Sequence, residues 1–498
     1  MKQWSVAGAT ALFSVLAATG AQAQVTPEEV WQNWQKLGAT YGQAIVADSV
    51  TREGDTLVVK GMKTSMNQDG ASLSGSMDEI RFRDLGDGTV EVSVSDTYVS
   101  TITMPGENGT PEVLDITLSQ PGLTMIASGG GTETAYAFDG PDVSISAQAK
   151  EGDKTLADIS ARMTGLTGAY LASQEGEISA LDTELEAQTV AFTIKGTNDA
   201  DTFDATGTMA AVRIATQGSF LGLAAMENMA QALKDGFVTD TGFSFGAGSF
   251  SIDVVEGGKP TKIDATAETG SFSAALSNEG ILAGAGGTGV DITISGAEIP
   301  FPELKVSYGE ASYEFSMPVS VTPEPAPFSF LTRIVDLTVS DEIWGIFDPT
   351  ATLPRDPATI ILDTTGTATL TNDLFDEAAM EAAGDAAPGQ LNALDVTEIL
   401  ARFAGAELTG KGSFTFDNSD LATYGGVPAP TGKIDLVLKG GNGLLDKLVA
   451  MGLIPQDQAM GARMMLAMVA KPGESQDVMN SSLEFKDKGF YANGQRLQ

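Results

Sequence analysis

The residue types that most enzymes use for acid-base and nucleophilic chemistry are missing, because the chain contains no histidine and no cysteine. Without imidazole there is no usual general base, no Ser or Cys triad and no common zinc ligand. Without a thiol there is no thiolate nucleophile. The sequence therefore favours a non-enzymatic protein, and it predicts no catalytic residue, no cofactor and no metal ion.

Two glycine motifs resemble known sites but lack the required context. Residues 242–246 match the nucleophile-elbow pattern, which needs a strand-to-helix turn and a histidine partner, yet residues 249–252 continue as an alternating strand. Residues 284–289 match G-x-G-x-x-G, whose pyrophosphate site needs a helix after the glycines. The strand-like residues 290–294 follow instead. We therefore predict a glycine-rich turn at 284–289 and no nucleophile at 242–246.

Carboxylates and methionines are the remaining candidates. Asp199, Asp201 and Asp204 lack the spacing of a calcium loop, so a solvated turn is predicted there. Paired carboxylates leave no mark in a sequence, which keeps open an enzyme that acts with carboxylates alone on envelope polysaccharide. Met460, Met464 and Met468 follow i, i+4, i+8 spacing. Flexible thioethers suit an adaptable binding groove, so these three are the predicted ligand-binding residues, with core filling as the alternative use.

The elements that would position these residues begin with a helix near residue 26. Thr26 is a typical cap, Pro27 suits the first helical position, and Val30, Trp34 and Leu37 follow helical spacing. The helix lacks the basic polar face of membrane-surface helices. It is therefore predicted to dock on the protein's own core.

After this helix the hydrophobic period changes to two. Residues 80–82 and 90–94 alternate on either side of a turn at 84–88, which predicts a hairpin with one apolar face. The same alternation recurs at 113–118, 143–147, 190–194, 243–254, 263–276, 290–294 and 304–315. The predicted fold is mainly β with a few helices (α+β), either a long curved antiparallel sheet or stacked sheets, with helices covering the edges.

Helical spacing and a proline-rich stretch set the predicted organisation. Helices are expected at 221–234, 328–337 and 396–404, and as a pair at 444–451 and 456–469. A hinge is predicted at the proline-rich residues 323–327. It would divide a β-rich half at 24–322 from a second β-rich half at 328–498 that ends in the methionine-rich helix pair.

The first 23 residues have the form of a secretory signal, with Lys2 before an apolar stretch and Ala21-Gln22-Ala23 at its end. Cleavage after Ala23 and a periplasmic location are predicted, with no transmembrane helix in the mature chain. The formal net charge is −38, from 28 basic and 66 acidic residues. So acidic a protein repels nucleic acid, which excludes nucleic-acid partners.

Several short phrases resemble a known family. Residues 25–34, residues 299–308, the motif Leu353-Pro354-Arg355-Asp356-Pro357 and residues 492–497 are similar to the domain of unknown function (DUF) 2125 family of exported Gram-negative proteins. The likeness spans nearly the whole mature chain. It implies export but no activity, and it transfers no functional residue.

Three functions remain at this point. The first is a periplasmic protein that binds or shields an apolar ligand, such as a lipid, or an envelope partner, on a sheet with one apolar face. The second is the carboxylate-dependent enzyme, and the third is a structural envelope component. The sequence leaves the ligand and the oligomeric state open.

Overall fold

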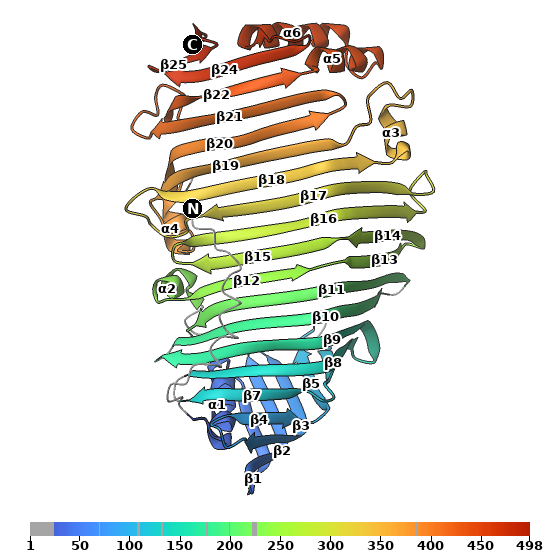
Figure 1. The fold of residues 1–498 in the computed structure, drawn as a ribbon, viewed down its shortest axis with the longest axis vertical. Coiled ribbons are helices and arrows are strands. Elements are labelled where there is room, and N and C mark those ends of the chain that lie inside the picture. The colour runs from blue at the N-terminus through green and yellow to red at the C-terminus, as the bar shows by residue number, and fades with distance from the viewer. Residues whose placement is uncertain are drawn as a thin grey trace. The chain divides into compact units, whose positions relative to one another are not determined.

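The computed structural model describes residues 24–68, 70–106, 110–130, 133–175, 178–198, 200–221, 227–384 and 386–498. The predicted signal peptide at 1–23 lies outside these residues. The prediction of a mainly β protein with a few helices and antiparallel strands is confirmed. The chain forms two compact units, and Figure 1 labels the elements of each. Unit 1 extends to Glu227 and includes Asp235–Gly258, whereas unit 2 comprises Asn228–Lys234 and Lys259–Gln498.

The described residues of unit 1 form one helix, and their strands are antiparallel. The helix, α1 (Pro27–Thr40), is capped by Thr26 as predicted, and a capping box forms there: the Glu29 N–H donates to the Thr26 side chain and the Thr26 N–H donates to the Glu29 carboxylate. The strands are β1 (Ala44–Glu53), β2 (Thr56–Gln68), β3 (Ala71–Asp84), β4 (Val90–Val94), β5 (Thr97–Met104), β6 (Glu112–Ser119), β7 (Thr124–Gly130), β8 (Glu133–Glu151), β9 (Lys154–Glu175), β10 (Ile178–Asn198), β11 (Asp201–Phe220), β12 (Val238–Phe245) and β13 (Gly248–Glu256).

The hydrophobic core of unit 1 lies where α1 packs against β1, β2 and β3. The predicted hairpin is β3–β4, which pairs Ile80 with Val94 and Phe82 with Val92. Ile80, Phe82 and Val92 are fully buried, and Phe82 meets the ring of Trp34 at 5.4 Å in an edge-to-face contact. The prediction that the N-terminal helix docks on the core is confirmed.

A line of unpaired residues crosses the sheet of unit 1 from strand to strand. We call it the bulge line, because the ladder skips one residue in each strand there, while the register on either side of it is unchanged. In unit 1 these residues are Asp48, Gly61, Asp78, Pro141, Gly165, Gln188 and Ala211. In β11 the buried positions change from Ala205 and Gly207 to Val212 across this line. The alternation thus restarts one residue later, and the same face of the sheet stays apolar on both sides of the line.

The described residues of unit 2 contribute further antiparallel strands, which are assigned to the same sheet as those of unit 1, and five helices. Its helices are α2 (Met229–Lys234), α3 (Asp341–Phe347), α4 (Glu377–Ala383), α5 (Gly441–Ala450) and α6 (Gln456–Val469). Its strands are β14 (Lys259–Ala267), β15 (Thr269–Ser277), β16 (Gly280–Gly296), β17 (Leu304–Met317), β18 (Ala326–Val339), β19 (Ala358–Leu370), β20 (Gly389–Phe403), β21 (Ala406–Asp417), β22 (Ala429–Lys439), β23 (Lys471–Pro472), β24 (Val478–Lys486), β25 (Gly489–Ala492) and β26 (Gln495–Arg496). Gly289, Gly309 and Asp336 form the bulge line of this unit.

Two predicted helices are strands. Residues 328–337 lie in β18, and residues 396–403 lie in β20 with Ala404 in the turn after it, so both helix predictions are wrong. Bulges produced the misleading spacing: Ile334 and Leu337 are three residues apart, yet they face residues only two apart on β19. Val396 and Ile399 likewise pair with glycines two apart on β21. The i, i+3 spacing of apolar residues, which resembled that of a helix, therefore results from an extra residue in each strand.

The predicted helix pair near the C-terminus is confirmed as α5 and α6. At 221–234 the helix is described only at Met229–Lys234, because residues 222–226 lie outside the described part of the chain. Residues 323–327 lie inside unit 2, and Ala326 and Pro327 already belong to β18, whereas the two units divide after Gly258. A hinge at 323–327 stays a prediction.

Gly440 and Gly452 flank α5 and differ in their surroundings. Both have a left-handed backbone, with φ of 70° and 73°, but a Cβ on Gly440 would overlap the Gly405 carbonyl oxygen, whereas one on Gly452 would meet nothing within 4 Å. We expect Gly440→Ala to destabilise the protein by at least about 1 kcal/mol more than Gly452→Ala, because only the first adds a steric clash to the left-handed penalty. Urea unfolding of both variants measures this difference, and equal midpoints would contradict the packing described here.

Candidate functional site

One face of the sheet in unit 1 is apolar across five neighbouring strands. Directly opposite residues of paired strands project to the same face, so the register defines rows that run across the sheet. Four successive rows on β8, β9, β10, β11 and β13 contain no charged side chain. They are Val143–Met163–Val190–Met209–Gly248, Ile145–Ala161–Phe192–Gly207–Phe250, Ala147–Ile159–Ile194–Ala205–Ile252 and Ala149–Ala157–Gly196–Phe203–Val254.

The opposite face of the same strands is polar. One of its rows is Ser146, Ser160, Thr193, Thr206 and Ser251. A shallow depression of about 280 Å³ lies on this face and is lined partly by serine, threonine and arginine side chains. The two faces therefore differ in the way expected for a sheet that buries only one of them.

The apolar face of unit 1 is only partly shielded from water. Ile159 and Phe203 remain 37% and 39% exposed, and none of the row residues belongs to a buried hydrophobic cluster of the described chain. The described helix of this unit, α1, packs mainly on β1, β2 and β3 instead. The rings of Phe192 and Phe250 lie 6.3 Å apart above Gly207, whose missing side chain leaves room for them.

Unit 2 repeats this arrangement on a wider sheet. Four rows on the strands from β15 to β22, continued by β24, also lack charged side chains. They are Gly270–Gly287–Ala311–Ile334–Ile360–Ala401–Leu408–Leu438–Met479, Phe272–Ala285–Tyr313–Thr332–Leu362–Ile399–Gly410–Leu436–Ser481, Ala274–Ala283–Phe315–Phe330–Thr364–Val396–Gly412–Ile434–Leu483 and, on the last six strands, Phe328–Gly366–Leu394–Phe414–Gly432–Phe485.

The apolar face of unit 2 is larger than the apolar patches usual on monomeric proteins, and that of unit 1 lies at the upper end of their range. Strands lie about 4.8 Å apart and rows about 7 Å apart, so the planar areas are roughly 600 Å² in unit 1 and roughly 1,000 Å² in unit 2. The largest apolar patch on a typical monomer is about 300–600 Å². In unit 2, Phe272, Tyr313 and Ile360 are 49%, 43% and 47% exposed. Uncovered faces of this size mark binding surfaces.

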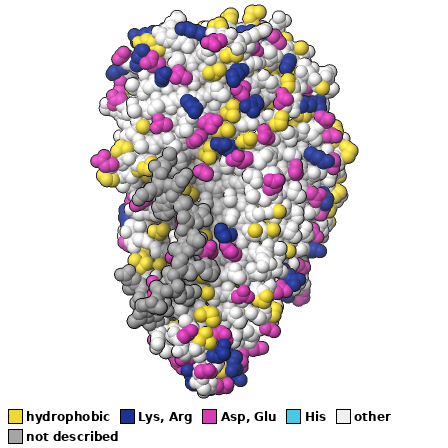
Figure 2. All heavy atoms as spheres, viewed as in Figure 1, with side chains coloured by type: hydrophobic (Ala, Val, Ile, Leu, Met, Phe, Trp, Pro, Cys, Tyr) yellow, Lys and Arg dark blue, Asp and Glu magenta, His cyan; other side chains and the backbone are white. Residues whose placement is uncertain are grey.

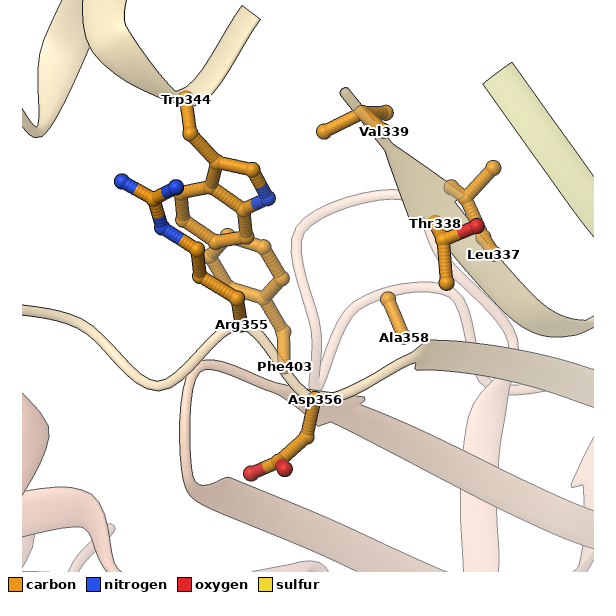
Figure 3. A pocket seen from close by; sticks show the side chains of 8 residues that line it. All are labelled: Leu337, Thr338, Val339, Trp344, Arg355, Asp356, Ala358 and Phe403. Atoms are coloured by element: carbon orange, nitrogen blue, oxygen red, sulfur yellow. The ribbon is translucent and has the colours of Figure 1, made fainter. Parts of the chain in front are cut away.

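An aromatic and cationic cluster lies at one end of the apolar face of unit 2 (Figure 3). Trp344 of α3 stacks on Phe403 with ring centroids 5.8 Å apart, and the Arg355 guanidinium lies 5.7 Å from the Trp344 ring. Beside them is a cavity of about 50 Å³ with Leu337 and Ala358 in its wall. It is far smaller than a ligand pocket of about 300–1,000 Å³, so a ligand would lie on the open face next to it.

A buried carboxylate fixes the loop that carries Arg355. Asp348 is fully buried and accepts hydrogen bonds from the N–H groups of Thr352 and Leu353 at 2.9 and 2.8 Å. Burial alone would raise the pKa of the Asp348 carboxyl, but these N–H groups and the nearby guanidinium outweigh it and hold the pKa below its usual value. Asp348 thus stays ionised and holds the start of the Leu353-Pro354-Arg355-Asp356-Pro357 motif.

The predicted ligand-binding methionines form an exposed stripe on α6. Met460, Met464 and Met468 are 57%, 63% and 65% exposed, so filling of the core, the alternative use, does not describe them. α6 packs on α5 and β24. Whether the stripe binds a ligand stays a prediction.

The two glycine motifs of the sequence both lie in or between strands. Residues 242–246 run from β12 towards β13, so the strand-to-helix turn of a nucleophile elbow is absent there, as predicted. Residues 284–289 lie inside β16 and pair with β15 and β17, so the predicted turn is wrong. The glycines allow close strand packing there, and a Cβ on Gly287 would lie 3.0 Å from the Thr269 carbonyl oxygen.

Acidic residues in the described part of the chain are the candidate ligands for a metal ion. No group of three or more Asp or Glu side chains there is placed to hold a metal ion. Asp201 accepts a bond from the Gly257 N–H and Asp204 pairs with Lys195, while Asp199 lies outside the described residues. Burial raises the pKa of the Asp182 carboxyl, with no second carboxylate contributing. Figure 2 shows acidic side chains scattered over the face it presents.

The chain matches no protein-family model, no curated protein and no solved structure in the comparisons made. The resemblance to the DUF2125 family therefore stays a prediction. None of the described helices is long and apolar enough to cross a membrane.

Proposed function

We propose that this protein binds the acyl chains of lipids on the apolar sheet faces of its two units. The observation that supports this function is the set of rows without charged side chains in each unit. These rows remain partly exposed to water and lie outside the buried hydrophobic clusters of the described chain. Water contact with so much hydrocarbon is unfavourable by about 25 cal/mol per Å². An apolar occupant would remove that cost.

An acyl chain suits these faces better than a polypeptide does. Backbone N–H and C=O groups within the sheets are already paired in the ladders, and the row side chains are mostly hydrocarbon. A peptide laid on such a face would lose hydrogen bonds to water at a cost of about 1–3 kcal/mol for each unmatched group. An acyl chain has no such groups.

The extent of the apolar face along the strands also suits an acyl chain. Four rows span about 20 Å along the strands, and an acyl chain is shorter than this, since it spans half of a bilayer core that is about 30 Å thick.

The proposal includes export to the periplasm through the predicted signal peptide. The predicted covering of sheet edges by helices also belongs to the proposal, and it is supported by α6, which packs on β24, and by α5, which packs on α6 and β21.

We expect protein purified from a periplasmic extract without detergent to carry lipid. Native mass spectrometry should show mass increments that disappear after solvent extraction, and the extract should contain the matching lipid. Stripped protein should then bind a hydrophobic fluorescent dye, because the faces become available again. A lipid-free preparation that also fails to bind the dye would contradict the proposal and favour a structural role.

A further inference from the structure

We propose that Arg355 binds the anionic head group of a lipid whose acyl chain lies on the apolar face of unit 2. This inference rests on the proposed function and adds the ligand's charge and orientation to it. The juxtaposition that supports it is a guanidinium group at the end of a partly exposed hydrocarbon surface. A lipid with an anionic head group matches this arrangement, because its charge lies at one end of a hydrocarbon chain.

The cluster around Arg355 is continuous with the apolar rows. Ile360 pairs with Ala401 in one row, and two residues further along each strand Ala358 and Phe403 project to the same face. Both line the small cavity beside Trp344, and Trp344 stacks on Phe403. An acyl chain lying over Ile360 would therefore end at the aromatic pair and the guanidinium above it.

Arg355 has donor capacity that its present contacts do not use. One terminal nitrogen donates to the Asp341 carboxylate, while Nε is buried and has no hydrogen-bond partner. Arginine presents its donors as a planar fork that fits phosphate and carboxylate oxygens. Stacking on Trp344 holds that fork in place.

The ion pair with Asp341 is weak enough to be exchanged. Asp341 is 82% exposed and Arg355 is 29% exposed, and ion pairs at such sites contribute about 0–1 kcal/mol. The nearby cations Arg402 and Lys439 differ, because both bind the more buried Glu407 and hold the pKa of its carboxyl below the usual value. Arg355 is therefore better placed than these two cations to change partner.

Other acidic groups near Arg355 do not fill the site. Asp348 is engaged by backbone N–H groups, and the Asp356 carboxylate points away from the aromatic pair in Figure 3. The large negative charge of the whole chain acts over longer distances, and salt at 0.15 M screens exposed charges beyond about 8 Å. A head group in contact with Arg355 would depend mainly on these near neighbours.

Binding of three probes to the full chain tests the inference: dodecyl phosphate, dodecanol and inorganic phosphate. We expect Arg355→Gln to weaken dodecyl phosphate binding about tenfold and to change dodecanol binding by less than twofold, because only the first probe uses the guanidinium. Asp341→Asn should strengthen dodecyl phosphate binding, since it removes the competing carboxylate. Inorganic phosphate should bind far more weakly than dodecyl phosphate.

The outcomes separate the two proposals. If neither dodecyl probe binds the wild-type protein, the proposed function fails. If both bind but Arg355→Gln affects them equally or not at all, only the head-group assignment fails. Inorganic phosphate binding as tightly as dodecyl phosphate would mean a site for free phosphate and would overturn the lipid assignment. Should Arg355→Gln unfold, the exposed Asp341→Asn carries the test alone, and unchanged binding of dodecyl phosphate would overturn the inference.

Discussion

Replacing Ile360 with aspartate is expected to lower the amount of co-purifying lipid at least tenfold. Ile360 lies in a charge-free row of unit 2 and is 47% exposed. A carboxylate there costs little in the lipid-free protein because water still reaches it. Under an acyl chain it would be buried without a partner, which costs several kcal/mol, and this difference appears as lost lipid affinity.

Leu282→Asp is the matched control. Leu282 is a similarly exposed aliphatic residue of the same unit, at 43%, but it pairs with Ser316 and projects to the opposite face. The control should retain lipid within twofold of the wild type, as measured by native mass spectrometry and solvent extraction. Equal losses in both variants would indicate general destabilisation. Equal retention in both would remove the apolar face of unit 2 as the binding surface.

Local patterns predicted the elements that obey simple rules. The capping residue Thr26 and the alternation from Ile80 to Val94 mark α1 and the β3–β4 hairpin, and both form as predicted. In these segments propensity, capping and hydrophobic period all indicate the same structure. The alternation of apolar and polar residues therefore predicted a strand correctly where the strand had no bulge.

Bulges set the limit of this approach. Asp336 has a left-handed backbone, with φ of 55°, and it inserts one residue between two stretches of alternating side chains in β18. In the sequence this looks like a helical step, because both a helix and a bulged strand place apolar residues three apart. The misplaced turn at 284–289 has a related cause, since glycine is common both in turns and where strands pack closely.

The candidate site was predictable only in part. Each strand revealed one apolar face, but the alignment of those faces into rows depends on cross-strand register, which a single sequence does not contain. Arg355 belongs to a motif noted only for its family resemblance. Its position beside Trp344 and Phe403 arises from three separate segments of unit 2. The arginine between two prolines was the one local signal that could have indicated this residue.

Phe82→Ala is expected to destabilise the protein by about 3–5 kcal/mol, the usual cost of removing a fully buried phenylalanine. Phe82 is 0% exposed and contacts both Trp31 and Trp34 of α1. The surrounding core has little freedom to close around the cavity, because two sides of it are paired strands.

Phe203→Ala removes the same side chain from the uncovered face of the same unit, where Phe203 is 39% exposed. This loss should cost less than about 1.5 kcal/mol in lipid-free protein, because much of the ring is already in contact with water. Urea unfolding of both stripped variants measures the two values. A Phe203→Ala cost close to that of Phe82→Ala would mean that the face of unit 1 is packed against something in the free protein, and the lipid proposal would then lose its main support in unit 1.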